Sequence, residues 1–395
     1  MHTVIEARSL LLEAVSPLQS TEVLTLGDGL GRVLAHPELA TFSVPSADNS
    51  AMDGYAFSAE DHAKAGGELP ISARIHAGDA PASLVRGSAA RIFTGATVPA
   101  GANVVAMQER CVECNDMLRI AGEVKAGQNI RYTGEDFQVG DTLLEAGHRL
   151  KPQDVGLLAS AGIDQVEVVR RARVAVLSTG NELVTAGEQR RAGRIYDSNG
   201  PMLCALLTQL GCTVLPASPV ADSPTMIRSL LDAAAAQADF VISTGGVSVG
   251  ESDYVRHAVE DLGHLDLWRI AVKPGKPVAF GVIRDTPFIG LPGNPVAAFV
   301  TFCLLAAPAI RRLQGRCDPV PVAVRLPAAF NRPAAPLEEY LRVCVKDGKL
   351  HPHMQQGSGI LTSVVRTDGL AQVHTDHGVR FGDLIDFLSF ETLSH

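Results

Sequence analysis

The chain has 395 residues, of which 46% are hydrophobic and 19% charged, and its formal net charge is −9. Most domains have roughly 100–200 residues, so this length predicts more than one domain, and the apolar fraction is that of a soluble globular protein. The acidic balance argues against nucleic acid as the main partner.

The N-terminal segment predicts a helix of the folded protein rather than a targeting signal. Residues 1–17 carry no basic cluster, and charged residues interrupt the apolar positions as they do in an amphipathic helix. Residues 295–310 form the most apolar stretch, but it is shorter than the ~18 residues that span a bilayer and is followed by two arginines. We therefore expect a cytoplasmic protein with no membrane segment.

The cysteines predict free thiols. There are seven, an odd number, in a chain without a secretory signal, which favours reduced thiols over a disulfide framework. Cys111 and Cys114 form the only close pair, and they lie in a segment that reads as strand and turn. Residues three apart on a strand point to opposite faces, and no histidine lies nearby, so we do not expect a zinc site.

Residues 47–139 predict a mostly β insertion. Short runs rich in valine and isoleucine alternate with glycine, proline and aspartate, which is typical of strands joined by long loops. Two polar turns stand out, at 48–57 around Asp53 and at 131–141 around Asp136. Considered alone, each of these turns is explained by ordinary turn chemistry.

Strand-like and helix-like segments alternate from about residue 173 to residue 315. Expected strands at 173–180, 212–220 and 239–246 are separated by expected helices. A long helix, with Asn294 as its cap and Pro295 next, closes the unit. This order predicts a parallel sheet with helices on both faces. After Cys317 the pattern returns to short strands, at the spacing of a small barrel or sandwich.

Several unusual loops follow the expected strands of this α/β unit. In such folds, ligands bind outside the carboxyl ends of the strands, so loops at one rim predict a binding site. The loops comprise residues 178–183, Asp222, 243–253, 273–277 and 291–295. The glycine-rich loop matches neither a nucleoside-triphosphatase loop nor a dinucleotide fingerprint. It would instead bind an anion through backbone N–H groups and the hydroxyls of Ser243, Thr244 and Ser248.

The charges of the rim suggest an anionic ligand and a hard metal ion. A helix N-terminus supplies only about half an elementary charge, so a phosphate or dianion needs nearby cations. Arg269, Lys273 and Lys276 could supply that charge, although any one of them could be an ordinary surface residue. The rim also carries acids that could bind Mg²⁺ directly or through water, although capping would also explain two of them; they are Glu182, Asp222 and Asp253.

Taken together, these motifs resemble those of a known family. The segments that carry the resemblance are PSADNSAMDGYAF, RIFTGATVPAGANVV, IRYTGEDFQVGD, VLSTGNEL, YDSNGPML, STGGVSVGESDY, AVKPGKPVAFG and GLPGNPVAA. In this order they closely resemble the molybdopterin molybdenumtransferases, bacterial enzymes related to the E domain of gephyrin. The match covers nearly the whole chain, and DNSAMDGYA with KPGKP and GLPGNP is its most specific part.

The resemblance implies a multidomain fold of the α/β plus β class. Its parts would be an N-terminal helical and linking domain at 1–46 and 140–172, a β-rich insertion domain at 47–139, a doubly wound molybdopterin-binding α/β domain at 173–316, and a C-terminal β-barrel at 317–395. It also implies a homodimer in which the insertion of one chain covers the α/β site of the other. Contact with the molybdopterin adenylyltransferase and with proteins that receive the cofactor would follow.

The same resemblance implies a reaction. The substrates would be molybdate and adenylylated molybdopterin, and a Mg²⁺-dependent step would cleave the phosphoanhydride and give molybdenum cofactor and AMP. The implied catalytic residues are Asp53, Asp136, Asp222, Asp253 and Lys273. The implied metal ligands are Glu182, Asp222 and Asp253.

The implied substrate-binding residues come from both the insertion and the α/β unit. They are Thr94, Glu182, Ser243, Thr244, Gly245, Gly246, Ser248, Gly250, Arg269, Lys276, Pro292, Gly293, Asn294 and Pro295. One position departs from the family, which often has lysine where this chain has Arg269. The charge is kept, but a planar guanidinium binds an oxyanion differently from an ammonium group.

Two other functions are compatible with parts of the sequence. The adenylyltransferase that activates molybdopterin with ATP uses the same α/β fold, but the insertion and the C-terminal domain argue against that function. A non-catalytic scaffold is the second alternative, since the gephyrin E domain also binds receptors. A scaffold would not need the acids and the lysine that the motifs gather.

Overall fold

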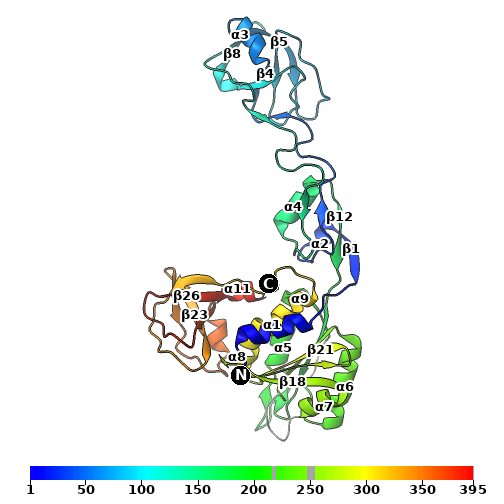
Figure 1. Cartoon of the computed structure of the whole chain (residues 1–395), viewed down its shortest axis with the longest axis vertical. Helices are drawn as coiled ribbons and strands as arrows, with labels where there is room; N and C mark the ends of the chain where they lie inside the picture. The colour runs from blue at the N-terminus through cyan, green and yellow to red at the C-terminus, as the bar shows by residue number, and fades with distance from the viewer. Residues whose placement is uncertain (216–218, 247–253, 395) are drawn as a thin grey trace.

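The computed structural model describes residues 1–215, 219–246 and 254–394. It is elongated, with the β insertion at one end and the α/β and C-terminal domains side by side at the other (Figure 1). A smaller linking domain lies between them. The fold class expected from the sequence, α/β plus β in several domains, is confirmed.

The insertion domain is built on one six-stranded sheet, with the order β7-β4-β6-β5-β9-β8. Its strands are β4 (Gly54–Phe57), β5 (Glu68–Ile75), β6 (Ala89–Ile92), β7 (Val104–Met107), β8 (Cys111–Cys114) and β9 (Met117–Ile120). The short helices α3 (Ala59–Lys64) and η1 (Gln108–Arg110) lie between strands. Cys111 and Cys114 are thus on a strand, as expected, and all seven cysteines are free thiols.

The linking domain joins the insertion to the rest through antiparallel strand pairs. Its elements are β1 (Thr21–Thr25) paired with β12 (Gln165–Val169), β2 (Glu38–Leu39) paired with β11 (Thr142–Leu144), α2 (Leu26–Gly29) and α4 (Pro152–Ser160). Beyond them, β3 (Asn49–Ser50) pairs with β10 (Ile130–Arg131). The two chain segments that lead to the insertion therefore run side by side.

Helix α1 (Val4–Ala14) confirms the amphipathic helix expected at the N-terminus. Thr3 and Glu6 form a capping box, in which each side chain bonds the other residue's backbone N–H. Its buried residues Val4, Ala7 and Leu11 belong to the core of the α/β domain. The sequence groups this helix with the linking domain, but its packing ties it to the α/β domain.

The sheet of the α/β domain is mixed rather than fully parallel. Its order is β16-β13-β17-β21-β20-β18, where β16 is Thr213–Leu215, β13 Arg173–Ser178, β17 Phe240–Thr244, β21 Thr286–Leu291, β20 Pro277–Ile283 and β18 Gly263–Arg269. The first four are parallel, whereas β20 is antiparallel to both of its neighbours. The expected parallel order is therefore wrong at this edge, because no crossover helix connects β18 to β20 or β20 to β21.

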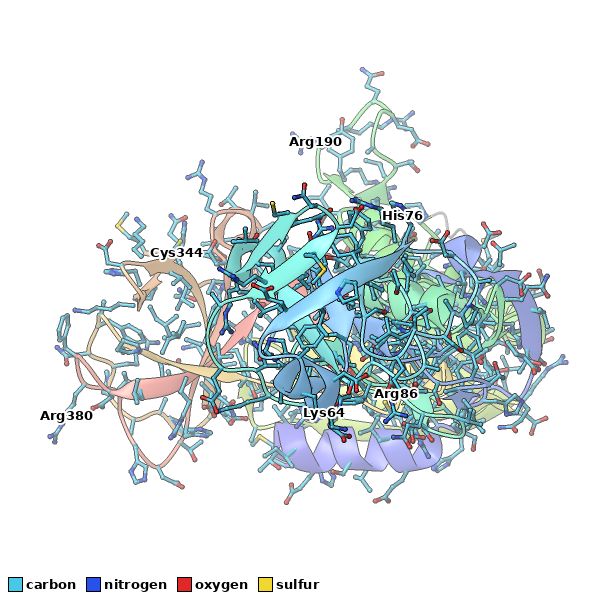
Figure 2. All side chains as sticks on the ribbon, turned by 90° about the horizontal axis from the view of Figure 1, so that it is seen from above. Lys64, His76, Arg86, Arg190, Cys344 and Arg380 are labelled. Atoms are coloured by element: carbon cyan, nitrogen blue, oxygen red, sulfur yellow. The ribbon has the colours of Figure 1, made fainter. Side chains whose placement is uncertain are left out.

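Helices cover both faces of this sheet, as expected. Helices α6 (Pro224–Gln237) and α7 (Tyr254–Leu262) pack on one face, and α5 (Asn199–Gln209) packs on the other. A small pair, β14 (Leu183–Val184) and β15 (Ile195–Tyr196), carries an exposed loop that includes Arg190 (Figure 2).

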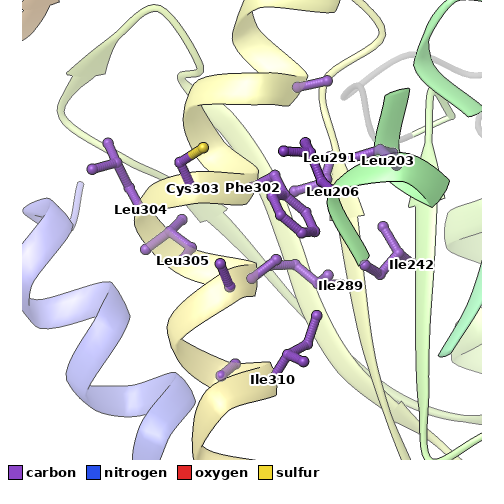
Figure 3. Packing of buried hydrophobic residues seen from close by; sticks show 14 of the residues in the cluster. Leu203, Leu206, Ile242, Ile289, Leu291, Phe302, Cys303, Leu304, Leu305 and Ile310 are labelled. Atoms are coloured by element: carbon purple, nitrogen blue, oxygen red, sulfur yellow. The ribbon is translucent and has the colours of Figure 1, made fainter. Parts of the chain in front are cut away.

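The long helix expected after Pro295 is present but changes pitch in the middle. It consists of α8 (Pro295–Thr301), a π-helical turn η2 (Phe302–Ala306) and α9 (Ala307–Leu313). Pro308 has no N–H to donate to the carbonyl four residues earlier, which explains why the turn is wider there. Its length and apolarity would allow a membrane span, but it is 94% buried inside the protein. Phe302 and Ile310 point toward the strand residue Ile289 (Figure 3), so this is a core helix.

The C-terminal domain is a curled sheet. It contains β22 (Val324–Pro327), β23 (Glu338–Lys346), β24 (Lys349–Pro352), β25 (Gly369–Val373) and β26 (Leu384–Ser389), with short helices α10 (Thr362–Val365) and α11 (Phe390–Ser394). An isolated bridge between Ala328 and Leu350 brings its two edges together, so it approaches the expected barrel. The short strand β19 (Val272–Lys273) leaves the α/β domain and pairs in parallel with β23.

Candidate functional site

Three parallel strands of the α/β sheet end at the same level. Ser178, Thr244 and Leu291 are paired across β13, β17 and β21. Beyond them, the Thr179 amide donates to the Thr244 carbonyl at 3.1 Å, and the Gly245 amide donates to the Leu291 carbonyl at 3.2 Å. The loops that follow these strands therefore begin at one rim, as the sequence predicts.

Asn199, at the start of α5, ties two of these loops together. Its buried side-chain amide donates to the Thr244 hydroxyl at 2.8 Å and to the Gly293 carbonyl at 2.7 Å. The Thr244 hydroxyl in turn donates to the Pro292 carbonyl at 3.2 Å. The sequence-based site residues omit Asn199, although it lies in the YDSNGPML segment that carries the family resemblance.

Several buried polar atoms at this rim have no hydrogen-bond partner within the described chain. They are the hydroxyls of Ser178, Thr179 and Ser243 and the side-chain oxygen of Asn199. Buried polar groups in proteins are almost always hydrogen-bonded. Unpartnered oxygens gathered at the ends of parallel strands indicate that a ligand or ordered water completes this rim.

The glycines after β17 leave no room for side chains. Gly245 and Gly246 have φ of 84° and 65°, and a Cβ on Gly245 would lie 2.7 Å from the Thr179 carbonyl oxygen. This close approach leaves the backbone itself as the surface of the loop. The predicted residues Ser248, Gly250 and Asp253 fall in 247–253 and lie outside the described residues.

A cavity of about 500 Å³ opens beside this rim. Its lining residues are Gly245, Gly246, Val272, Lys273, Pro274, Gly275, Lys276, Pro277, Pro292, Gly293, Asn294, Ala297, Leu337, Gln356, Gly357 and Ser358. The last four belong to the C-terminal domain, and the Val296 amide donates to the Ser358 carbonyl at 2.9 Å, which holds the two domains together here. Sequence reasoning missed this wall because it lies some sixty residues further along the chain.

Some of the predicted cations and loop residues line the cavity, and others do not. Lys273 and Lys276 line it, and Asn294 lines it as well. Asn294 is the N-cap residue of α8, as expected, although its side chain makes no capping hydrogen bond. Pro295 is the first residue of α8.

Arg269 is exposed at the end of β18 and is not a lining residue of the cavity. Arg269 and Lys273 do not share a strand face, because they lie on strands of different sheets.

The acids Glu182 and Asp222 lie on neighbouring loops at the same edge of the sheet. The Asn181 amide donates to the Asp222 carboxylate at 3.1 Å, and the Asp222 amide donates back to the Asn181 side chain at 3.0 Å. Among the described residues, no three acids, histidines or cysteines form a metal-binding group. The donor chemistry of Glu182 and Asp222 fits Mg²⁺ nevertheless, because magnesium typically uses one or two carboxylates together with water and phosphate oxygens.

The predicted residues of the insertion domain form a separate group. The backbone N–H and the hydroxyl of Thr94 both donate to one Asp53 carboxylate oxygen, at 2.8 Å each. These bonds, chiefly that from the backbone, hold the pKa of Asp53 below its usual value. Asp136 is exposed near the linking strands, and its amide donates to the Val44 carbonyl at 3.0 Å. Within one chain, the insertion domain lies at the far end of the molecule from the α/β domain (Figure 1).

A second cavity, of about 620 Å³, lies between the linking domain and the end of α9. It contains none of the predicted site residues. Some of its polar groups already have partners, because Arg316 forms an ion pair with Asp318 at 3.0 Å and a His148 ring nitrogen is hydrogen-bonded to Asp154 at 2.7 Å. The smaller cavity at the strand ends is therefore the better candidate, since unpartnered polar atoms and conformationally restricted glycines lie next to it.

Known protein families match almost the whole chain. Residues 2–162 match the MoeA N-terminal region (domains I and II), residues 175–312 a probable molybdopterin-binding domain, and residues 324–390 the MoeA C-terminal region (domain IV). Molybdopterin molybdenumtransferase of Haemophilus influenzae is 42% identical over 318 residues, which is 80% of this chain and 78% of the relative. The enzyme of the same name from a Nostoc species is 38% identical over 378 residues, or 91% and 86% of the two chains.

Solved structures share the complete architecture. Two crystal structures of the molybdopterin biosynthesis MoeA protein from Pyrococcus horikoshii are similar to this chain. One has a TM-score of 0.87 and 29% identity, covering 99% of this chain and 100% of the other. The second has a TM-score of 0.81 and 30% identity, covering 98% of each chain.

Proposed function

This chain belongs to the molybdopterin molybdenumtransferases, and from that premise we propose that it inserts molybdenum from molybdate into adenylylated molybdopterin, forming molybdenum cofactor and AMP. The observation that carries this proposal is the cavity at the ends of β17 and β21. It combines backbone-lined glycine loops, suited to phosphate, with two lysines suited to an oxyanion. The unpartnered hydroxyls next to it add further hydrogen-bond donors.

The two parts of the cavity suggest a division of roles. The N–H groups of the loop that begins at Gly245 would bind the phosphate of the pterin, together with the hydroxyls of Ser243 and Ser178. Lys273 and Lys276 would bind the oxygens of molybdate. Such fixed, positively charged donors stabilise a dianion more strongly inside a partly enclosed cavity than in water.

Magnesium would assist the cleavage step. Glu182 and Asp222 would hold Mg²⁺, together with Asp253 as the sequence suggests, and the ion would neutralise charge on the phosphoanhydride as AMP leaves. The pairing of Asp222 with Asn181 keeps the carboxylate oriented, because one carboxylate oxygen accepts the Asn181 amide.

The acids of the insertion would complete the site only in a homodimer. The insertion domain, which carries Asp53 and Thr94, lies at the opposite end of the molecule from its own α/β domain (Figure 1), which supports a composite site in which a second chain supplies these residues and Asp136. The bonds from Thr94 keep Asp53 ionised, so it would act as a hydrogen-bond or metal-water acceptor and not as a proton donor at neutral pH.

One assay distinguishes the proposed reaction from its alternatives. The purified protein is incubated with adenylylated molybdopterin, Mg²⁺ and molybdate, and AMP and molybdenum cofactor are measured. We expect release of AMP that depends on molybdate. Consumption of ATP with free molybdopterin would indicate an adenylyltransferase, and no turnover in either assay would indicate a scaffold. Replacing molybdate with tungstate in the same assay measures oxyanion selectivity.

A further inference from the structure

Lys273 is anchored by a carboxylate of the C-terminal domain. Its Nζ donates to Glu339 Oε1 at 2.9 Å, and the two residues are paired in the parallel contact between β19 and β23. The lysine side chain is 59% exposed, whereas the Glu339 side chain is only 3% exposed. An exposed cation that lines the cavity is thus tied to a buried acid.

Glu339 is shared with a second cation. Arg332 Nε donates to Oε2 at 2.7 Å, and the other end of the guanidinium donates to Oε1 at 3.0 Å. Burial alone would raise the pKa of Glu339, but the bonds from Arg332 and Lys273 outweigh it and lower the pKa. The carboxylate is therefore ionised, and the three groups together carry one positive charge.

This arrangement lets Lys273 remain a binding group while it is held in place. An ammonium group has three N–H donors, and the bond to Glu339 uses one of them. Arg332 offsets the charge of Glu339, so the charge of the lysine is not cancelled. Two donors and a net positive charge can therefore be directed into the cavity.

We propose that Glu339 is a positioning residue for oxyanion binding, which acts by fixing the ammonium group of Lys273 in the cavity. The inference rests on the proposed function, because it takes molybdate as the ligand of Lys273. It makes the C-terminal domain part of the site and explains why β19 leaves the α/β domain to pair with β23. Glu339 is not among the residues expected from the sequence.

The change Glu339→Gln separates positioning from simple charge. Removing the carboxylate raises the local charge from one to two, so electrostatics alone would tighten binding of an anion. Glutamine has a single acceptor oxygen, however, and its NH₂ group cannot face a second cation. The more exposed Lys273 would be displaced, since Arg332 binds through a two-pronged, preorganised guanidinium.

The test measures molybdate binding by titration calorimetry, and half-saturating concentrations of molybdate and of adenylylated molybdopterin in the AMP assay. For Glu339→Gln we expect the molybdate Kd to rise about tenfold, with little change for the pterin substrate. The double variant Glu339→Gln with Lys273→Ala should bind molybdate no more weakly than Lys273→Ala alone, because both changes remove the same contact. Glu338→Gln, one residue earlier on β23, is the matched control and should leave molybdate binding unchanged.

Several results would overturn the proposal. One such result is tighter or unchanged molybdate binding in Glu339→Gln. Another is a double variant that binds molybdate more weakly than Lys273→Ala alone. The third is a wild-type protein that binds no molybdate. If the wild type binds molybdate but releases no AMP, the proposed function fails, whereas the calorimetric comparison still decides the role of Glu339. Should Glu339→Gln unfold, Glu339→Asp keeps the charge, and its shorter side chain should weaken molybdate binding while the melting temperature is retained.

Discussion

Asp53 in the insertion domain is held as a carboxylate by a single residue. Thr94 donates both its backbone N–H and its hydroxyl to the same oxygen, and Arg91 adds a smaller electrostatic attraction. These interactions favour the charged form, so the pKa lies below its usual value and the group loses its proton at lower pH than a free aspartate. Asp53 therefore stays ionised in mildly acidic solution and can still act there as a hydrogen-bond acceptor.

Changing Thr94→Val tests this link between geometry and pH. The substitution removes the hydroxyl bond and keeps the backbone bond, so the pKa of Asp53 should rise part of the way to its usual value. Because the ionised form is lost as pH falls through the pKa, the acidic limb of the pH–activity profile should move to higher pH. An NMR titration of the Asp53 carboxyl carbon measures the shift directly. No shift, or a shift in the opposite direction, would exclude the Thr94 hydroxyl as a cause of the low pKa.

Asp222 offers a second test at a single residue. Asp222→Asn keeps an oxygen that can accept from the Asn181 amide, so the loop should stay in place while one negative charge is removed. We expect the Mg²⁺ concentration for half-maximal activity to rise about tenfold or more, equivalent to roughly 1.4 kcal/mol. Asp232→Asn is the matched control, since that acid pairs with Arg284 on another part of the domain. A similar Mg²⁺ requirement in both variants would contradict a metal role for Asp222.

Among the secondary-structure elements, β4 depends on one glycine of the DNSAMDGYA segment. A Cβ on Gly54 would lie 1.9 Å from the Ala106 carbonyl oxygen of β7, and backbone atoms cannot move aside as a side chain can. The residue next to Asp53 is therefore glycine for a packing reason, and any side chain there would separate the two strands.

We expect Gly54→Ala to destabilise the insertion domain by about 2–4 kcal/mol and to reduce activity, because it displaces the turn that carries Asp53. Hydrogen exchange at β4 and β7 amides measures the local effect. Gly156→Ala, at a helical glycine of α4 with open space around it, is the control and should stabilise the protein by about 0.5–1 kcal/mol. Equal exchange rates in wild type and Gly54→Ala would show that the contact is relieved without cost.

The sequence predicts the elements that depend on residues close together in the chain. The rim loops follow from glycine and polar residues directly after each buried strand, and α1 follows from the charged residues that interrupt its apolar positions. The antiparallel edge at β20 was not predicted, because it depends on which strands pair after short turns. The role of Glu339 and the cavity wall at Gln356 and Ser358 could not be predicted either, because they reach the site only when the C-terminal domain packs against the α/β domain.

The whole molecule separates its predicted site residues into two distant groups. The insertion domain, which carries Asp53, lies at one end of the molecule, and the α/β domain, which contributes Lys273 to the cavity, lies at the other (Figure 1). Antiparallel strand pairs connect the two ends, so the insertion is extended away from its own α/β domain. An extended arm that carries polar turns is suited to reach the site of a second chain.

Complementation between inactive chains tests this arrangement. In a dimer with composite sites, Asp53→Ala affects the site of the partner and Asp253→Ala affects the site of its own chain. A mixed dimer then has both changes in one site and none in the other. If chains pair at random, half of the dimers are mixed and roughly one site in four is intact, so about a quarter of wild-type AMP release should return after subunit exchange. Native mass spectrometry of differently tagged chains confirms the exchange, and full exchange without any recovered activity would mean that each site is built within a single chain.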